Sequence, residues 1–272
     1  MERSALAAAI DRSAALAMRL HMIGDDRTER RHGLAVARRA GLVCLSSTEM
    51  PDDLFTRALG YGTFAPATQR QIDAAVRHYT ALRLPTRFEV MHGAVPRAAV
   101  RLLVRNGFRE EKGARQVHVL ELTRAPRAVE SGELRVERVR RVDAMRYARL
   151  ASRGFGSKGP IGLLFERGWI RQLRSGRYAT AFVGSVRRTP AATGVLITDG
   201  KAAGLYSGSV LPRFRGNAFQ NAMIRARVRY GYDRGFKLFY AMSEPDNASA
   251  RNVRDEGFVT RFVMRRSMRE TD

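Results

Sequence analysis

The same succession of strand-like and helix-like sequence patterns occurs twice along this chain of 272 residues. In each half a strand-like stretch leads to a proline, a helical pattern, a second strand, a second helical pattern and a Gly-Phe pair. The prolines are Pro66 and Pro212, and the pairs are Gly107-Phe108 and Gly257-Phe258, so the copies are offset by roughly 150 residues. Self-similarity at this spacing predicts an internal duplication.

The boundary between the copies is expected at residues 124–132, which show no strand or helix periodicity and contain proline and glycine. A chain of this length suits two domains of about 130 residues each. We therefore predict a first domain over residues 1–123, a linker over 124–132 and a second domain over 133–272.

The second half shows strand and helix patterns in regular succession. Apolar alternation and short apolar runs predict strands at 134–139, 178–186, 192–198, 202–210, 238–242 and 258–264. Apolar residues at helical spacing predict helices at 142–153, around 163–173 and at about 217–234. A further short helix is expected between a cap at Asp246 or Asn247 and Gly257.

The long helix at about 217–234 should bury one apolar stripe, made of Phe219, Ala222, Met223, Ala226 and Tyr230. The first half predicts strands at 55–61 and 86–90. Its helices are expected at 96–106 and over a face formed by Ile72, Ala75, Val76 and Tyr79.

The charge of the chain is strongly positive, with 49 Lys and Arg against 26 Asp and Glu and a formal net charge of +23. Such a surplus favours a polyanionic partner, namely nucleic acid, an anionic membrane or a phosphorylated cofactor. Only four of the basic residues are lysines, and the arginines are spread along the whole chain. A general arginine bias carried on solvated helix faces is therefore the alternative explanation.

The single cysteine, Cys44, excludes an intrachain disulfide and a cysteine-based metal site. It stands between apolar neighbours, which is typical of a small buried side chain. The apolar run 5–10 is interrupted by Asp11 and Arg12, so it predicts a helix and not a signal peptide. No stretch approaches 18 apolar residues, so no membrane span and a cytoplasmic location are expected.

Residues 209–224 carry the pattern with the most chemical content. A predicted strand ends at Val210, a turn contains Pro212, and a helix begins within Arg215–Gln220. A tight turn at a helix N-terminus presents several unpaired N–H groups in one direction, and the helix dipole makes this an anion site suited to a diphosphate. Gly216 lets the backbone approach such a ligand closely, and Arg215 adds positive charge.

This stretch resembles the cofactor loop of the GNAT acetyltransferase superfamily. The matching residues are Val210-Leu211-Pro212, Arg215-Gly216, Met223-Ile224 and Gly235, with Ser249, Asn252 and Gly257-Phe258 downstream. The resemblance implies an α/β fold with two GNAT-like domains. Each would contain a mixed, mostly antiparallel sheet with flanking helices and a splayed central pair of parallel strands. It also implies a tandem GNAT in which the N-terminal copy is degenerate, since no glycine follows Pro66 before the next helix.

The family pattern Arg/Gln-x-x-Gly-x-Gly/Ala falls on Arg215, Ala218 and Gln220 when the proline is aligned, so both glycines are replaced. A register shifted onto Arg213, Gly216 and Ala218 fits literally but misplaces the proline, and we prefer the first. A cradle of backbone amides tolerates Ala218 if its φ is helical. Gln220 is expected to fit as a residue of the helix start.

By this resemblance the C-terminal copy binds acetyl-CoA. It then transfers the acetyl group to a primary amine, expected on a small molecule, which attacks the thioester directly. The pantetheine arm would run along the backbone of 208–210, between strands 202–210 and 238–242. The implied cofactor-binding residues are Gly208, Ser209, Val210, Arg215, Gly216, Asn217, Ala218, Phe219, Gln220 and Asn252.

Acetyl transfer to an amine needs a base and a proton donor. All five histidines lie in the first half, so no histidine base is expected within the C-terminal copy unless the domains share a cleft. Glu244 follows a central strand and is the first candidate base, although it can equally belong to a polar loop. Tyr206 can relay a proton through water or serve as a packed aromatic side chain. The position of the family's tyrosine acid holds Val253, so Tyr240 or another hydroxyl substitutes, or the thiolate leaves unprotonated.

The segment Gly154–Gly159 matches G-x-G-x-x-G but follows a predicted helix, so it is not a dinucleotide fingerprint. We expect a mobile loop there that closes over the acceptor site. No metal-binding spacing is present. Two alternative functions remain open: a non-catalytic acyl-CoA-binding or regulatory protein, and an acetyltransferase that acts on an RNA-linked amine. The acceptor and the oligomeric state are not predicted.

Overall fold

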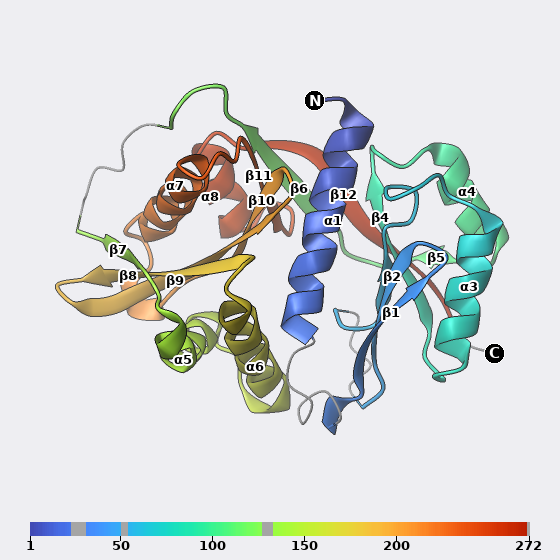
Figure 1. The fold of residues 1–272 in the computed structure, drawn as a ribbon, viewed down its shortest axis with the longest axis horizontal. Helices are drawn as coiled ribbons and strands as arrows, with labels where there is room; N and C mark the ends of the chain where they lie inside the picture. The colour runs from blue at the N-terminus through green and yellow to red at the C-terminus, as the bar shows by residue number, and fades with distance from the viewer. Residues whose placement is uncertain (23–30, 50–53, 127–132, 271–272) are drawn as a thin grey trace. The chain divides into compact units, whose positions relative to one another are not determined.

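The computed structural model describes residues 1–22, 31–49, 54–126 and 133–270 (Figure 1). The chain divides into two compact units, Met1–Val117 with Thr260–Asp272 and His118–Val259. Each unit has its own hydrophobic core. Most of the expected linker, residues 127–132, lies outside the described residues.

The units differ from the two continuous domains expected from the sequence. The division falls inside strand β6 (Arg115–Glu121), so residues 118–123 belong to the second unit. Strand β12 (Val259–Arg269) belongs to the first unit from Thr260 onward. There it pairs antiparallel with β4 (Thr86–His92) over Val263–Arg269. Periodicity predicts that a strand exists, but the choice of sheet edge depends on long-range pairing, which the local pattern does not contain.

In its described residues, the first unit has a sheet with the neighbour order β1-β2-β3-β4-β12 and the helices named below. Strands β3 and β4 are parallel, and the other pairs are antiparallel. Its remaining strands are β1 (Leu34–Arg39), β2 (Leu42–Ser47), β3 (Arg57–Leu59) and β5 (Arg109–Glu110). Its helices are α1 (Arg3–Met22), α3 (Gln69–Thr80) and α4 (Arg97–Arg105).

The core of the first unit contains two buried tyrosines whose hydroxyls are hydrogen-bonded. Tyr79 donates to the carbonyl of Leu45 at 2.9 Å, and Tyr61 donates to that of Ala99 at 3.0 Å. Helix α3 buries Ile72, Ala75 and Tyr79 as its apolar spacing predicts, while Val76 is half-buried. Cys44 is fully buried in β2, which confirms its prediction as a small core side chain.

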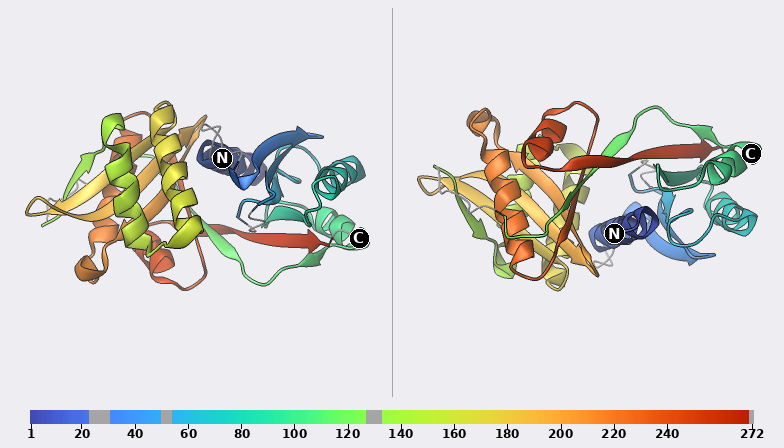
Figure 2. Two further views of the ribbon diagram at one scale, coloured as in Figure 1. Left: turned by 90° about the horizontal axis from the view of Figure 1, so that it is seen from below. Right: turned by 90° about the horizontal axis from the view of Figure 1, so that it is seen from above.

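The second unit contains the strand order β6-β11-β10-β9-β8-β7, in which β10 and β11 are parallel and β7 to β10 are antiparallel. Helices α5 and α6 cover one face of this sheet, and α7 and α8 cover the other (Figure 2). The strands are β7 (Arg135–Arg138), β8 (Ala179–Val186), β9 (Thr189–Asp199), β10 (Ala202–Val210) and β11 (Leu238–Ser243). The helices are η1 (Arg141–Asp143), α5 (Ala144–Phe155), α6 (Gly159–Ser175), η2 (Pro212–Phe214), α7 (Phe219–Tyr232) and α8 (Ala248–Asp255).

Every strand and helix predicted for the second half is present, but the buried face of α7 is rotated from the predicted stripe. Phe219 and Met223 are buried as expected, whereas Ala222, Ala226 and Tyr230 are only half-buried. The buried face instead continues through Ile224, Arg227, Val228 and Gly231. The apolar spacing predicts the wrong face because the buried face includes a charged residue, Arg227.

The two halves share the backbone geometry that a duplication predicts. Gly107 and Gly257 end their helices with φ of +81° and +84°. In both copies the amide of the following phenylalanine donates to the carbonyl five residues earlier at 3.1 Å. Each unit also contains a parallel strand pair, namely β3 with β4 in the first and β10 with β11 in the second. The duplicated α/β architecture expected from the sequence is therefore present. Among the described residues, no helix is long and apolar enough to cross a membrane.

Candidate functional site

Strands β10 and β11 pair over only four residues, Ala202–Leu205 with Leu238–Ala241, although β10 continues to Val210. Where they part, β10 contains a bulge. Its register with β9 shifts between Tyr206 and Ser209, and Ser207 has a φ of +49°. A bulge re-aims the backbone N–H and C=O groups of its strand. The end of β10 therefore offers backbone to an extended ligand, at the place where the sequence predicted a splayed pair.

Three side chains from different elements hold the bulge. Trp169 of α6 donates from Nε1 to Ser207 Oγ at 2.7 Å. Thr193 of β9 lies with its Oγ1 2.7 Å from Ser209 Oγ. Arg227 of α7 donates to the carbonyl of Tyr206 at 3.1 Å. The geometry of the bulge is thus fixed by the surrounding fold, and the side chain of Ser209 is bound to Thr193 of the neighbouring strand.

Arg227 is buried to 2% exposure beneath the bulge. It donates to the carbonyls of Met223 at 2.9 Å and Val195 at 3.4 Å in addition to that of Tyr206. Burial lowers its pKa to about 10. A Cβ at Gly194 would lie 2.8 Å from its guanidinium carbon, so this glycine makes room for the side chain. Arg227 therefore satisfies carbonyl groups around the irregular part of the strand.

The segment between β10 and α7 contains two residues in the left-handed region. Gly216 has a φ of +86°, and the space where a Cβ would be is open. Ala218, the N-cap of α7, has a φ of +52° and makes no side-chain capping bond. The condition of a helical φ at Ala218 is not met, because the loop keeps the conformation that glycine would favour there. Gln220 lies in the first turn of α7, as expected.

An uncapped helix N-terminus leaves its first backbone N–H groups without intrahelical partners. These groups and the helix dipole favour a bound anion. In α7 they belong to the segment from Ala218 through Phe219 and Gln220. The side chain of Phe219 is buried in the core, so only its backbone can contribute.

The corresponding helix of the first unit closes its own N-terminus. Thr68 caps α3: its Oγ1 accepts from the amide of Gln71 at 3.4 Å, and its amide donates to Gln71 Oε1 at 3.1 Å. This helix also begins three residues after Pro66, whereas α7 begins seven residues after Pro212. The loop before the helix is therefore shorter in the first copy. There the side chains of Thr68 and Gln71 make the hydrogen bonds that cap the helix.

Two of the predicted cofactor residues shape the loop. Arg215 donates from Nε to the carbonyl of Val210 at 3.3 Å and from a terminal nitrogen to that of Gly154 at 3.2 Å. Asn217 donates from Nδ2 to the carbonyls of Phe214 and Arg215 at 3.2 and 3.3 Å. These contacts fasten the loop to the strand end and to α5, while both side chains remain exposed.

Gly208 and Gln220 meet between the bulge and α7. A Cβ at position 208 would collide with Gln220 Nε2, so a larger residue there would displace the end of the Gln220 side chain. Gln220 Oε1 is buried, and no hydrogen bond to it is found among the described residues. A buried acceptor without a donor is costly, which marks it as a place where a ligand's N–H would be stabilised.

Tyr206 and Tyr240 face each other across the separating strands. Their hydroxyls lie 2.7 Å apart, and their rings are 89° from parallel. Tyr240 is buried and Tyr206 is half-buried. Tyr206 is thus both a packed aromatic and a member of a hydroxyl pair, which joins the two interpretations made from the sequence.

Glu244 follows the last residue of β11, and its side chain is exposed. The helix after it is capped by Asn247, whose side chain accepts from the amide of Ala250 at 2.8 Å. Glu244 therefore lies at the end of a central strand, in the polar loop before α8. This position agrees both with a residue that follows a central strand and with a member of a polar loop, the two alternatives given by the sequence.

His118 is a residue that the sequence analysis missed. It lies in β6 within the second unit, is fully buried, and its Nε2 is 2.8 Å from Ser243 Oγ at the end of β11. Burial and the nearby Arg254 lower the pKa of His118. The sequence places all five histidines in the first half, but the second unit begins at His118, so one histidine lies within it. The sequence signal for this placement would have been the apolar alternation of residues 115–121.

Helix α8 is fastened to α7 near the loop. The carbonyl of Asn252 accepts from Asn221 at 3.4 Å, and Arg225 pairs with Glu256 at 2.7 Å. Asn252 itself is half-buried. Val253 belongs to the core, so the position of the family's tyrosine acid holds no donor.

The segment Gly154–Gly159 differs from the expected loop. Gly154 and Phe155 belong to α5, and α6 begins at Gly159. Gly154 is needed for close packing, since a Cβ there would collide with Ser209. The segment is thus a short helix–helix connection. In the described part of the chain, no group of three His, Cys, Asp or Glu is placed to hold a metal ion.

No family model and no curated protein matches this sequence. Several solved structures share its fold. A tandem GNAT protein from the clavulanic acid biosynthesis pathway is 14% identical with a TM-score of 0.64, over 90% of this chain and 86% of that one. A GNAT-type N-acetyltransferase from Kribbella flavida is 12% identical with a TM-score of 0.62, over 93% of this chain and 95% of that one.

A GNAT acetyltransferase from Colwellia psychrerythraea is 11% identical with a TM-score of 0.54, over 78% of this chain and 76% of that one. These similarities define the class of the fold. The chain has the tandem GNAT fold, as the resemblance in its cofactor loop implied.

Proposed function

We propose that the second unit is an N-acetyltransferase that uses acetyl-CoA to acetylate a primary amine of a small molecule. The observation that carries this proposal is the difference between the two copies. The second copy keeps an uncapped helix N-terminus, with Ala218 as its N-cap, beside a bulged and splayed strand. The first copy caps the equivalent helix with Thr68 and Gln71.

The residues present fit acetyl-CoA, which would supply an acetyl group activated as a thioester. The backbone amides from Gly216 to Gln220 suit its diphosphate. The backbone of Gly208–Val210 suits the amides of its pantetheine arm, and Gln220 Oε1 is a buried acceptor awaiting such a donor. Arg215 belongs to this loop, and Asn252 lies on α8, which is bonded to α7 beside it.

The chain's own groups can serve the acceptor amine in three ways. Backbone N–H groups of the bulge can stabilise negative charge that develops on a carbonyl oxygen. The Tyr206–Tyr240 pair offers a hydroxyl at the point where the strands separate. Glu244 and the His118–Ser243 pair lie at the end of β11 and can accept a proton, directly or through water.

The test is thermal unfolding with and without saturating acetyl-CoA, on wild type, Gly216→Glu and Gly235→Glu. The two glycines are matched, with φ of +86° and +88° and open space around each, at opposite ends of α7. A ligand at a hundred times its Kd stabilises by about 2.7 kcal/mol, and each kcal/mol shifts Tm by roughly 2–4 °C.

We expect both variants to lose similar intrinsic stability and only Gly216→Glu to lose the shift caused by acetyl-CoA. A shift that survives in Gly216→Glu, or none in wild type, would contradict the proposal.

A non-catalytic acyl-CoA-binding protein is the second candidate function, favoured by the buried Val253 at the tyrosine position. Binding of acetyl-CoA without any thiol release over a broad panel of amines would support it. Turnover of one amine, lost in Gly216→Glu and retained in Gly235→Glu, would exclude it.

A further inference from the structure

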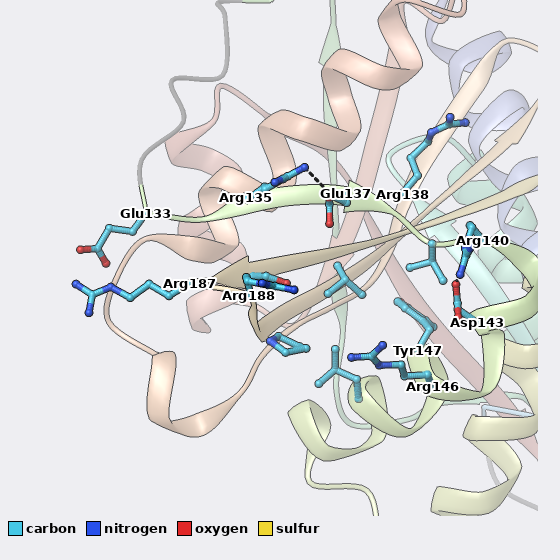
Figure 3. A pocket seen from close by; sticks show the side chains of 15 residues that line it. Glu133, Arg135, Glu137, Arg138, Arg140, Asp143, Arg146, Tyr147, Arg187 and Arg188 are labelled. Atoms are coloured by element: carbon cyan, nitrogen blue, oxygen red, sulfur yellow. Dashed lines mark hydrogen bonds and ion pairs between the residues drawn. The ribbon is translucent and has the colours of Figure 1, made fainter.

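The second unit contains a cavity of about 750 Å³ between β7, the start of α5 and the β8–β9 turn (Figure 3). None of the residues predicted to bind acetyl-CoA lines it. The apolar part of its lining, which we call the floor, includes Tyr147, Leu150, Val183 and Pro190. Its rim carries six arginines and three carboxylates, namely Arg135, Arg138, Arg140, Arg146, Arg187, Arg188, Glu133, Glu137 and Asp143. We call it the arginine pocket.

Part of the positive charge on the rim is already neutralised. Arg135 pairs with Glu137 at 2.8 Å, and Arg140 pairs with Asp143 at 2.9 Å. Arg138 lies over the ring of Tyr230.

The other three arginines on the rim are Arg146, Arg187 and Arg188. No ion pair or hydrogen bond of their side chains is found among the described residues. The arginine pocket therefore keeps an excess of unpaired guanidinium groups.

Two of these guanidinium groups converge. Arg146 extends from α5 and Arg188 from the β8–β9 turn into the same space above the apolar floor, whereas Arg187 points away from it (Figure 3). Guanidinium groups donate two parallel hydrogen bonds to a phosphate oxygen pair, and two of them around one space form a clamp for a doubly charged anion.

The turn that presents Arg188 is strained. Val186 pairs with Thr189, which leaves Arg187 and Arg188 as a two-residue hairpin loop with φ of +46° and +69°. Such turns favour Asn and Gly, because other residues are strained at positive φ. Strained residues cluster at ligand sites, where their side chains serve a function.

We propose that the arginine pocket binds an organic phosphate of nucleotide size. The phosphate would lie between Arg146 and Arg188, with its apolar or aromatic body on the floor of the pocket. A volume of about 750 Å³ is in the range of small-molecule sites. The same chemistry is offered by a free nucleotide and by a nucleotide of an RNA chain. This proposal does not depend on acetyl transfer.

The first test is calorimetric titration with uridine 5′-monophosphate of wild type, Arg188→Gly and Arg187→Gly. The two variants remove the same charge and relieve similar strain, so both should have a higher Tm than wild type. Only Arg188→Gly should weaken binding, by about tenfold or more, the loss expected for one charge-assisted hydrogen-bond partner. Equal loss in both variants would show a diffuse charge effect and overturn the proposal.

Gly216→Glu serves as the control for the acetyl-CoA cradle. If it abolishes binding of the nucleotide while Arg188→Gly does not, the probe binds at the cradle and the arginine pocket is not its site. Absence of nucleotide binding also overturns the proposal, unless a single-stranded 12-nucleotide RNA binds in fluorescence anisotropy and depends on Arg188. RNA binding with that dependence and a steep decrease with salt would identify a nucleic acid as the source.

Discussion

At the scale of single residues, the first unit buries two carboxyl groups, those of Asp11 and Glu89. Asp11 of α1 is only 3% exposed and accepts a hydrogen bond from Thr63. Burial, with a smaller contribution from Glu89, raises the pKa of Asp11 to about 7, and Thr63 and Arg57 oppose the rise. By contrast, Arg57 and Arg115 hold the pKa of the buried Glu89 below its usual value against its burial. The charge of Glu89 is compensated by the two arginines. Asp11 is instead stabilised as the neutral acid.

The sign of the pH dependence follows from this difference. The unfolded chain ionises Asp11 near pH 4, while the folded chain keeps the proton up to about pH 7. Between these values the folded state binds more protons, so the contribution of Asp11 to the free energy of unfolding falls as pH rises. The contribution lost is about 1.4 kcal/mol for each unit of pKa difference.

Asp11→Asn should remove this decrease in the free energy of unfolding with rising pH. In urea unfolding from pH 4.5 to pH 8, the difference in stability between variant and wild type should grow with pH in favour of the variant. The comparison cancels the opposite trend from the histidines whose pKa burial lowers. Asp233→Asn, at a half-exposed carboxylate, is the control and should show a flat difference. A flat difference for Asp11→Asn as well would mean that Asp11 is ionised in the fold.

At the scale of elements, the N-terminus of α7 combines strain with open amides. Ala218 has a φ of +52°, which costs an alanine about 1 kcal/mol or more relative to the right-handed region. The proposed acetyl-CoA site would use only the backbone at this position, so glycine should serve it equally well. The strain at Ala218 is thus a local property of the loop and no requirement of an anion site.

Ala218→Gly should therefore raise the stability of the protein by several tenths of a kcal/mol to about 1 kcal/mol and leave any acetyl-CoA shift intact. Ala222→Gly, one turn further along the same helix, should lower stability by about 1 kcal/mol. Thermal unfolding of both variants checks this. A lower Tm for Ala218→Gly, as for its control, would show that position 218 is helical.

The elements themselves were largely predictable from the sequence. Strand β10 has the bounds that its apolar pattern predicts, and α8 is capped at Asn247, one of the two expected positions. The bulge at Ser207, the left-handed Ala218 and the burial of Arg227 were not predictable. Each depends on contacts from other elements, whereas a periodic pattern reports only which face of its own element is apolar.

At the scale of the whole molecule, one strand at the end of the chain completes a sheet formed near its beginning. Residues 263–269 of β12 pair with β4, although the Gly-Phe repeat that precedes them belongs to the second copy. The same exchange carries His118 into the second unit through β6. Sequence periodicity locates the two copies but not this exchange, so it does not predict a histidine in the second unit.

Truncation after Val259 should therefore destabilise the first unit, whose β4 loses a partner strand, more than the second, which keeps Phe258 in its core. Native-state hydrogen exchange checks this, because unpaired strand amides lose protection. Amides of β4 (Thr86–His92) should exchange far faster in the truncated chain, while those of β9 (Thr189–Asp199) should stay protected. If the proposed function also holds, this chain should retain an acetyl-CoA shift. Faster exchange in β9 with an unchanged β4 would instead assign the C-terminal strand to the second unit, as two continuous domains would require.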